Sequence, residues 1–413
     1  MSNYQVFYKV EYLTLEIVTG SGNILKLTNS EIGQIELYES LEIPGITGSI
    51  SVIDFRGILE LYNVSAGDTF KFSWKTPKSQ TISSSYTITK VILNDFPPDD
   101  FVNNHVRFEF CSTWYLNGIT KTYSNLWKNQ SLDKICSNLI SYCGGNIGTV
   151  ETSNITLEHF GSPYWSPVKT LYYLIGFYGK GIVMFPDIST DNVNFVSLDT
   201  IFSSGYGTYQ PKFVMYPENQ NYEALVYNMT VEQITNIEDY AGNGLGGLNF
   251  TGFNFDQKNF QTPNPFYATP QQVPFSNIAT VGTLSKQFQG GDYVNNQQLS
   301  IFPQTKNPVS QSFLNNIISN IQNSYYLKLL ADAVKLNILT NGSSDRKIGQ
   351  VCNIEVPSLK NNKSEGDKNL SGQYVISSIK RVFRLSTVKE LISCINTGTF
   401  KSNNPNLPKL KNV

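Results

Sequence analysis

The stretch from 41 to 74 constrains the fold more than any other part of this sequence. Residues 46–53 alternate between apolar and small polar side chains, which predicts a strand that ends on an aspartate. Residues 57–62, with the sequence GILELY, then predict one short helical turn. A Gly-Asp pair at 67–68 forms a tight turn, and residues 69–74 alternate as in a half-buried strand. The expected unit is therefore a strand, a helical turn, a tight turn and a second strand.

The β pattern continues over the whole N-terminal part of the chain. Six or more short strands, separated by turn-forming residues, are typical of a small barrel or sandwich. We therefore predict an N-terminal β-barrel domain over residues 1–125. Its further alternating segments lie at 24–27, 32–43, 86–93 and 106–111.

Helices enter the pattern after this first domain. Ser131 is a helix N-cap, and the apolar residues after it recur at helical spacing up to Cys143. A second helix is predicted over 166–178, because Ser-Pro at its start supplies an N-cap and a proline at the first helical position. A short hairpin over 181–198 follows. These elements predict an α+β domain over residues 126–210.

The next part of the chain, residues 211–331, is predicted to be an irregular or β middle domain. One or two strands are expected within 213–231, and a helix begins at Ser310 or Ser312. Residues 240–307 are rich in Gly, Asn, Gln, Pro and Phe and show no regular period. Two interpretations stay open for them: irregular structure that orders against a neighbouring subunit, or strands whose pattern the asparagines obscure.

The last part of the chain returns to a β pattern. Four alternating segments predict a C-terminal β-barrel over residues 332–400, followed by an extended tail over 401–413. The predicted fold class is thus mainly β with α+β insertions, in which two small β-barrels flank helix-containing middle domains. The four segments lie at 334–338, 349–357, 371–383 and 387–396.

Composition argues against several functions. The formal net charge is −1, so no overall positive field attracts nucleic acid or an acidic membrane surface. No run of about 18 apolar residues occurs, and no basic N-terminal region leads into an apolar stretch, so we expect no stable membrane insertion. Charged residues make up 15% of the chain, against roughly 25% in an ordinary soluble protein. This low charge suits a protein covered by other subunits, and an AT-rich genome is the alternative explanation.

The five cysteines are expected to be free thiols in the core. Their number is odd, and none has the spacing of metal ligands. Cys136 and Cys143 lie about two turns apart on one predicted helix, which is too far for a disulfide. We therefore expect the protein to be made in a reducing cytoplasm.

The sequence carries little catalytic chemistry. Neither His105 nor His159 has a second metal ligand at a suitable spacing, so no metal site is predicted. The glycine-rich segment 242–247 lacks the Lys and Ser/Thr of a phosphate-binding loop, and no cofactor is predicted. A peptidase that pairs Cys143 with His159 is disfavoured, because Cys143 lies on an apolar helix face. The carboxylate pairs fall in predicted turns, where solvated residues are common. These pairs are Asp99 with Asp100, Asp187 with Asp191, and Glu238 with Asp239.

One group of basic residues is a candidate for nucleic-acid binding. Lys380, Arg381 and Arg384 lie on one predicted strand, with Phe383 among them. A single group of this size cannot supply the many phosphate contacts that affinity requires, so no specific nucleic-acid binding is predicted.

The 41–74 unit resembles the first barrel of the phage tail hub (baseplate hub) family. It is similar both to the hubs of contractile tails and to the N-terminal hub part of secretion-system spike proteins. The residues that carry this resemblance are Pro44, Gly48, Asp54, Leu59, Glu60, Gly67 and Asp68.

Two later parts of the chain resemble the same family. Trp-Ser-Pro at 165–167 and FVSLDTIF at 195–202 are similar to the second hub domain, and the segments at 349–357 and 371–383 are similar to the last hub barrel. Two positions depart from the family pattern and leave the subfamily open. These are Arg381, near a place where the family often has His, and Gln350, where it often has an acid.

The resemblance implies a structural virion protein without enzyme activity or cofactor. Three copies would form a ring, a homotrimer that adapts the sixfold tail tube to a threefold spike and leaves a channel for DNA. The implied partners are the tail tube protein and the tail spike or needle protein, with the tape measure as a further one. The implied location is the virion tail, after assembly in the host bacterial cytoplasm.

The barrel rims are the expected contact with the tube, including the strand at 43–53. Three alternatives remain: another β-rich tail component such as a distal tail or adaptor protein, a cell-wall hydrolase, and a carbohydrate-binding module. The predicted interface residues are Ile43, Ile46, Ser49, Ile50, Val52 and Asp54.

Overall fold

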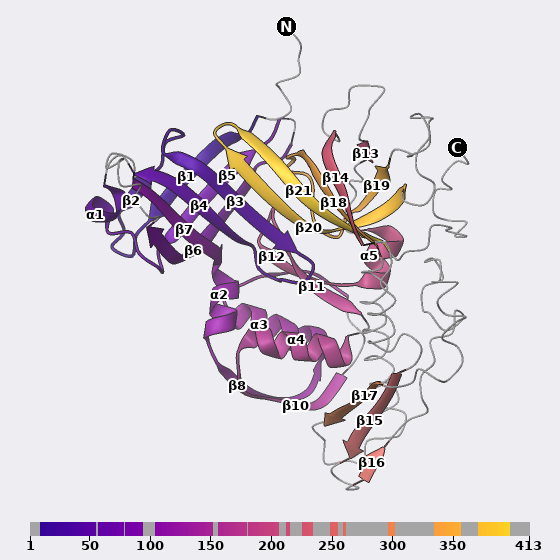
Figure 1. Cartoon of the computed structure of the whole chain (residues 1–413). Helices are drawn as coiled ribbons and strands as arrows, with labels where there is room; N and C mark the ends of the chain where they lie inside the picture. Colours follow the sequence, from indigo (N-terminus) through magenta and orange to yellow (C-terminus); the bar gives the residue numbers. More distant parts are fainter. Residues whose placement is uncertain are drawn as a thin grey trace, which may run out of the picture.

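The computed structural model confirms the predicted fold class, since strands dominate and helices are inserted between them (Figure 1). The predicted helix after Ser310 or Ser312 and the tail at 401–413 lie outside the described residues. The described residues are 9–54, 57–77, 79–93, 104–151, 156–179, 181–205, 212–214, 225–233, 248–254, 259–261, 296–301, 334–356 and 371–396.

Thirteen of the described strands form one sheet that runs through both ends of the chain. Its order is β14-β18-β21-β20-β3-β4-β7-β6-β5-β1-β2, with β19 beside β20 and β13 beside β19. The first seven strands are β1 (Glu11–Val18), β2 (Ile24–Lys26), β3 (Ile32–Ser40), β4 (Thr47–Asp54), β5 (Thr69–Lys75), β6 (Ile82–Leu93) and β7 (Asn104–Ser112). The others are β13 (Lys212–Val214), β14 (Val226–Gln233), β18 (Val334–Asn341), β19 (Val351–Glu355), β20 (Gly372–Arg384) and β21 (Thr387–Asn396).

The 13-residue strand β20 joins the two ends of this sheet. Its first part pairs with β19, and its second part pairs with β3, where Phe383 lies opposite Ile35. In Figure 1, β20 and β21 (yellow) lie between the purple N-terminal strands and the orange strands β18 and β19. β20 can belong to both ends of the sheet because its inward side chains pack in one core along its first part and in another core along its second part.

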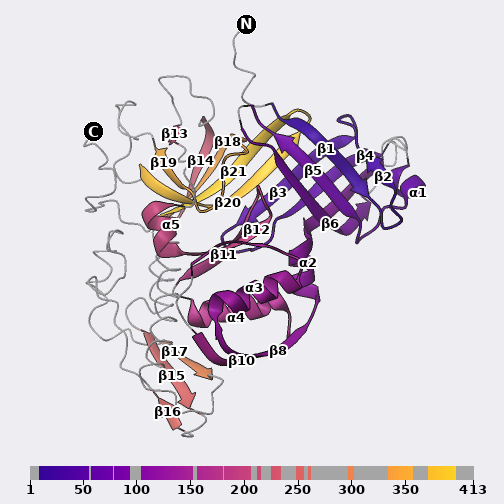
Figure 2. The same cartoon turned by 180° about the vertical axis from the view of Figure 1, so that it is seen from behind.

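The N-terminal strands curl into the first barrel, formed by β1 to β7 and the tip of the β20–β21 hairpin. A bridge between Lys9 and Thr387, and a 2.8 Å hydrogen bond from Val10 N–H to the Ser386 carbonyl, bring β1 against that tip. Figure 2 shows β1, β5 and β6 on the near side of this barrel. The buried side chains inside this barrel form the first core, which includes Ile17, Ile35, Ile50, Val52, Phe70, Phe72, Trp74, Tyr86, Phe108, Phe110, Ile188, Phe383 and Val388.

The other end of the sheet, β13, β14 and β18 to β21, forms the second lobe. Its inward side chains make a separate second core, to which the N-terminal barrel contributes Leu41. Cys352 and Cys394 both lie in this core, on strands that are separated by β20. The second core also includes Phe185, Phe213, Leu336, Ile338, Ile354, Tyr374, Val375, Ile376, Ile379 and Ile392.

The helices of residues 113–178 lie on one side of the sheet, as Figures 1 and 2 both show, whereas α1 (Ile58–Tyr62) lies at the outer end of the first barrel. The two predicted helices are confirmed, α3 (Leu132–Tyr142) and α4 (Pro167–Tyr178), and the α4 N-cap Ser166 accepts a 3.3 Å hydrogen bond from Lys169 N–H. The predicted hairpin is β11 (Ile182–Asp187) with β12 (Asn192–Ser197). The sequence did not indicate α2 (Thr113–Thr120), β8 (Tyr123–Ser131), β9 (Ile147–Val150), β10 (Thr156–Trp165) or α5 (Leu198–Ser204).

The region from 240 to 307 contains described strands. β15 (Leu248–Asn254) pairs with β16 (Asn259–Gln261) and with β17 (Asn296–Ile301). Of the two interpretations of this region, the structure favours strands with an obscured pattern for the described part.

Candidate functional site

The predicted interface strand lies in the interior of the first barrel. β4 pairs with β3 on one side and β7 on the other, so it has no free backbone edge. Ile46, Ile50 and Val52 are fully buried in the first core, and Ser49 is also buried. Ile43 is partly buried. Contact of this strand with a tube stays a prediction, but its buried side chains pack inside the chain, and only outward residues can supply a surface.

Two aspartates of the 41–74 unit hold its turns in place. Both carboxylate oxygens of Asp54 accept hydrogen bonds from Ile58 N–H, at 2.7 and 2.8 Å, and so fix the start of α1 (Ile58–Tyr62). Asp68 accepts 2.7 Å hydrogen bonds from Gly20 N–H and Ser65 N–H. These two aspartates, which carry part of the family resemblance, therefore satisfy backbone N–H groups in the turns of the unit.

A row of charged side chains lies at the junction, which is our name for the place where the first and second cores meet. We call Glu39, Arg381 and Glu390 the polar row; they lie on β3, β20 and β21 and are 0 or 1% exposed. Arg381 donates to Glu39, to Glu390 at 3.0 Å and to the Arg346 carbonyl at 2.5 Å. Desolvation would lower the pKa of Arg381, but the two carboxylates raise it, so the guanidinium stays charged. Burial raises the pKa of Glu39, which the Arg381 charge opposes.

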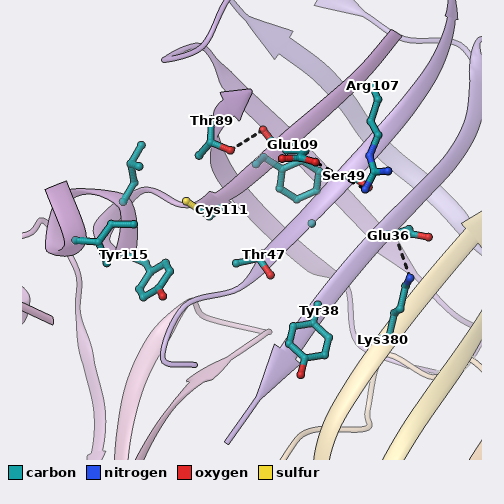
Figure 3. Close-up of a pocket in the computed structure, with 14 residues that line it drawn as sticks. Glu36, Tyr38, Thr47, Ser49, Thr89, Arg107, Glu109, Cys111, Tyr115 and Lys380 are labelled. Atoms are coloured by element: carbon teal, nitrogen blue, oxygen red, sulfur yellow. Dashed lines mark hydrogen bonds and ion pairs between the residues drawn. The ribbon is translucent and has the colours of Figure 1, made fainter. Parts of the chain in front are cut away.

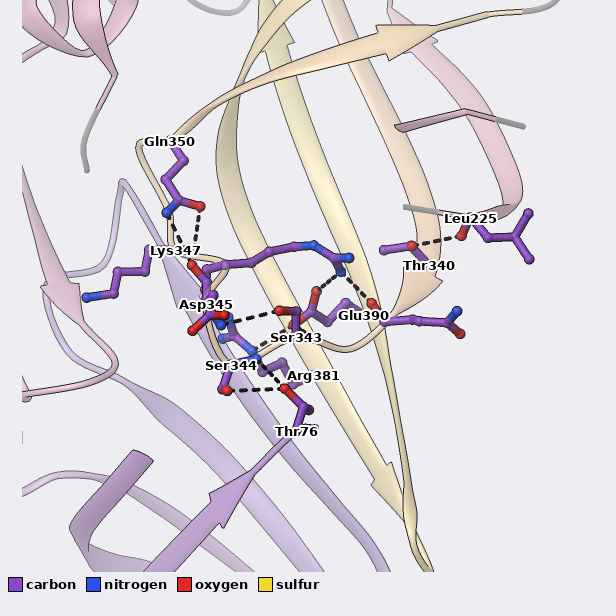
Figure 4. Close-up of polar contacts among 12 residues, drawn as sticks. Thr76, Leu225, Thr340, Ser343, Ser344, Asp345, Lys347, Gln350, Arg381 and Glu390 are labelled. Carbon is purple, nitrogen blue, oxygen red and sulfur yellow. Dashed lines mark hydrogen bonds and ion pairs between the residues drawn. The ribbon is translucent and has the colours of Figure 1, made fainter. Parts of the chain in front are cut away.

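A loop at 341–350 closes over the polar row (Figure 4). Arg346 lies within it, fully buried, and donates to Glu390 at 2.5 Å and to the Asn341 carbonyl. Ser343 N–H donates to Glu390 at 3.1 Å. The buried cluster thus combines two guanidinium groups with two carboxylates, and its formal charges balance.

The same loop contacts the first barrel. Ser344 N–H donates to Thr76 Oγ1 at 3.2 Å, and Ser344 Oγ donates to the Gln80 carbonyl at 3.0 Å. Thr76 and Gln80 follow β5, on the N-terminal side of the junction. The loop is therefore bonded at once to the polar row and to the wall of the first barrel.

We call residues 113–204, which contain α2 to α5 and β8 to β12, the helical layer. The turn between β11 and β12 joins this layer to both lobes. Ile188 is fully buried in the first core, and Asp187 pairs with Lys347 at 3.0 Å. Asp191 accepts a 2.6 Å hydrogen bond from Ser112 Oγ, and burial raises its pKa to about 6. The expectation that Asp187 and Asp191 are solvated turn residues is therefore wrong: the turn is packed into the junction, where its carboxylates have protein partners.

A groove of about 590 Å³, lined by charged and apolar side chains, lies on the outward face of β3, β4, β6 and β7, beside α2 and Lys380 of β20 (Figure 3). Its charges are paired: Lys380 lies 3.2 Å from Glu36, and Arg107 lies 3.9 Å from Glu109. Tyr115 borders the opposite side. The charged side chains of this groove are paired with each other, which suits contact with a partner surface more than catalysis.

The candidate reactive groups form no recognisable catalytic or metal site in the described part of the chain, although Cys352 Sγ and Cys394 Sγ lie 3.8 Å apart. All five cysteines are free and buried, as predicted. Within the described ranges, no group of three His, Cys, Asp or Glu side chains could hold a metal ion. The other carboxylate pairs, at 99–100 and 238–239, lie outside the described residues. No helix in the described part of the chain is long and apolar enough to cross a membrane.

The basic group predicted on β20 is divided between two faces. Lys380 and Arg384 lie on the outward face, where Arg384 donates to Gln34 at 2.7 Å. Arg381 points inward into the polar row. The three residues therefore do not form one exposed basic surface.

Comparison with known proteins gives similarity of fold without similarity of sequence. No protein-family model matches the chain, and a search of curated proteins finds no match. A 43 kDa tail protein of prophage MuSo2 from Shewanella oneidensis has a TM-score of 0.53 and 11% identity, and the alignment covers 95% of this chain and 100% of that one. A tail protein from Neisseria meningitidis has a TM-score of 0.57 and 8% identity, with coverage of 95% and 98%.

A third solved structure links this fold to secretion systems. It is a type VI secretion system component of Escherichia coli that is structurally similar to the bacteriophage T4 tail proteins gp27 and gp5. Its TM-score is 0.50 at 10% identity, and the alignment covers 97% of this chain and 80% of that one. The chain therefore has the fold of phage tail proteins, in agreement with the resemblance seen in its sequence.

Proposed function

We propose that the chain is a tail hub subunit, three copies of which close into a ring that adapts a sixfold tail tube to a threefold spike. The observation that carries this proposal is one continuous sheet with two separately packed cores in a single chain. Three such chains would present six curved sheet units around an axis. Two units per chain are the simplest way for a threefold object to match a sixfold one.

The surface of the chain is consistent with this role. Few of its residues are charged, and the groove on the first barrel pairs its charges internally. A surface of this kind costs less to desolvate than a strongly charged one. We place the tube contact on the outward residues of the first barrel rim. A spike or needle protein would bind the opposite face of the ring, and the axis would leave a channel for DNA.

No catalytic role is part of this proposal. The buried carboxylates of the junction are bonded to Arg, Lys and Ser side chains. Burial raises the pKa values of the Cys111, Cys136 and Cys143 thiols. Thiols in that state are poor nucleophiles. A distal tail or adaptor protein is the second candidate, because it shares the requirement for a β-rich, ring-forming chain.

Native mass spectrometry and electron microscopy of the purified protein test the proposal. We expect a species of three times the 46.3 kDa chain mass, and class averages of a threefold ring with six peripheral units and an open centre. If the chain alone stays monomeric, the same measurement is made with the tube protein and the spike protein added. A closed twofold or sixfold assembly would overturn the hub proposal and favour the adaptor.

A further inference from the structure

The polar row interrupts an otherwise apolar interior. On β20, Ile379 belongs to the second core and Phe383 to the first, with Arg381 between them. On β21, Val388 and Ile392 flank Glu390 in the same way. Leu, Ile or Met at these positions would make one continuous core. Because a buried ion pair is seldom more stabilising than well-packed apolar side chains, stability alone does not account for the charges.

The charged groups make the contact between the two lobes depend on their relative orientation. The guanidinium of Arg381 is planar, and its acceptors lie on three segments: Glu39 on β3, Glu390 on β21, and the Arg346 carbonyl in the loop. A rotation of one lobe against the other would break at least one of these bonds, and a buried charge without its partner is costly. An apolar contact would tolerate a range of angles.

The loop at 341–350 forms hydrogen bonds on both sides of the junction between the lobes. Arg346 and Ser343 bind Glu390, on the second-lobe side, while Ser344 binds Thr76 and Gln80 beside the first barrel. A change of angle between the lobes therefore strains the row and the loop together.

We propose that Glu39, Arg346, Arg381 and Glu390 form an orientation lock, a buried charge cluster that fixes the angle between the first barrel and the second lobe. This role concerns the single chain. Its consequence for assembly rests on the proposed hub function: a ring in which two units per chain alternate closes only if the angle within each chain is fixed.

The angle is measured as a distance distribution between spin labels by double electron–electron resonance. Ala66→Cys labels an exposed turn of the first barrel, and Asn228→Cys labels an exposed position on β14. Mixing labelled chains with an excess of unlabelled chains leaves only distances within one chain. The unsubstituted protein, with five buried native thiols, is the control for background labelling.

Two variants remove the lock. Arg381→Lys keeps one charge but loses the fork that holds three acceptors. The quadruple variant Glu39→Leu, Arg346→Met, Arg381→Met and Glu390→Leu removes all four charges and leaves the net charge unchanged. The matched control is Glu36→Leu with Lys380→Met, which deletes the ion pair on the outward face of the same two strands.

We expect a narrow distribution in the wild type and the control, and a distribution about twofold broader in both lock variants. A folded quadruple variant with the wild-type width would overturn the lock. If the quadruple variant does not fold, Arg381→Lys decides alone, and an unchanged width overturns the proposal. Broadening in a chain that forms no trimer supports the lock while the hub proposal fails, so the two failures are distinguishable.

Discussion

The first and second cores differ in the side chains that fill them. The first core contains a group of aromatic rings, in which Phe383 lies 5.2 Å from Phe72 and 4.9 Å from Trp74 between ring centroids. The second core is largely aliphatic, and its buried aromatic members in the described part of the chain are Phe185, Phe213 and Tyr374. The central ring of the first core thus comes from the far end of the chain.

This difference shows that the two lobes depend on each other unequally. The first barrel takes Phe383 and Val388 from β20 and β21, and Ile188 from the helical layer. Among the described residues, Leu41, which directly follows β3, is the one that the second core takes from the N-terminal barrel. The boundaries predicted at 125 and 332 stay predictions about the chain, but the cores cross both of them, and the polar row lies where they meet.

Removing the central charge of the polar row should have the largest effect on both cores. Arg381→Met leaves Glu39 buried without its guanidinium partner and leaves Glu390 with Arg346 as its remaining one, so we expect a loss of about 3–5 kcal/mol in the free energy of unfolding. Urea denaturation followed by tryptophan fluorescence and by far-UV circular dichroism measures it. None of the four tryptophans lies in the second core, so agreement of the two probes shows that the cores unfold together.

The control for this change is Arg384→Met on the same strand. Arg384 is exposed, so we expect a change within about 0.5 kcal/mol. A similar small loss for Arg381→Met would contradict the view that its charge is what the two buried carboxylates require.

Phe383 tests the unequal dependence directly. Phe383→Ala opens a cavity among the rings of the first core, and we expect a loss of about 3–4 kcal/mol. Fluorescence of Trp74, which contacts Phe383, should change before the second lobe unfolds. Leu385→Ala, two residues away and 66% exposed in the wild type, should change stability by less than about 0.5 kcal/mol. Equal losses from the two variants would show that the first core is complete without the hairpin.

The sequence predicted what depends on local pattern. Helical spacing located α3, Ser-Pro located the start of α4, and strict alternation located β5. It did not predict α2, whose Trp, Tyr, Gly and Ile residues are weak helix formers. β8 was also missed, because Trp127 is its only fully buried residue and no alternation results.

The polar row illustrates a signal that was present but incomplete. Alternation on β20 places Arg381 on the same face as Ile379 and Phe383, so an inward charge was there to be found. Its partner Glu39 lies 342 residues away in the sequence. No local pattern can identify a partner at that separation, and the role of Arg381 becomes clear only when the sheet is assembled.

The joint between the helical layer and the first barrel is expected to depend on pH. Burial raises the pKa of Asp191 to about 6 from the usual 3.8, so the folded state keeps its proton longer than the unfolded state. Burial of the ionised carboxylate therefore destabilises the folded state. This destabilisation is absent below pH 3.8, grows up to pH 6 and is complete above it. Asp191→Asn removes it, so we expect the variant to gain about 1–3 kcal/mol over the wild type between pH 4 and pH 7.

Denaturation at both pH values measures this gain. Glu60→Gln is the control, because Glu60 is exposed and its change should stay within about 0.5 kcal/mol at either pH. A difference between Asp191→Asn and the wild type that is the same at pH 4 and pH 7 would show that the carboxylate is well solvated.

The ion pair between Lys347 and Asp187 should contribute least to the free energy of unfolding. Removing it tests whether apolar packing or charge attraction holds the β11–β12 turn in the junction. Burial alone would raise the pKa of Asp187, but hydrogen bonds from Ser189 and Lys347 and the Lys347 charge lower it. The contribution is therefore present above the unfolded pKa and lost as the pH falls through the folded one. We expect Lys347→Ala to cost about 0.5–1 kcal/mol at pH 7 and nothing in strong acid. Lys75→Ala breaks an exposed ion pair of the same 3.0 Å length with Glu11 and should cost less. If both variants cost the same, the Ile188 packing and the hydrogen bond from Ser112 to Asp191 hold the turn in place, and the Lys347–Asp187 pair adds nothing to them.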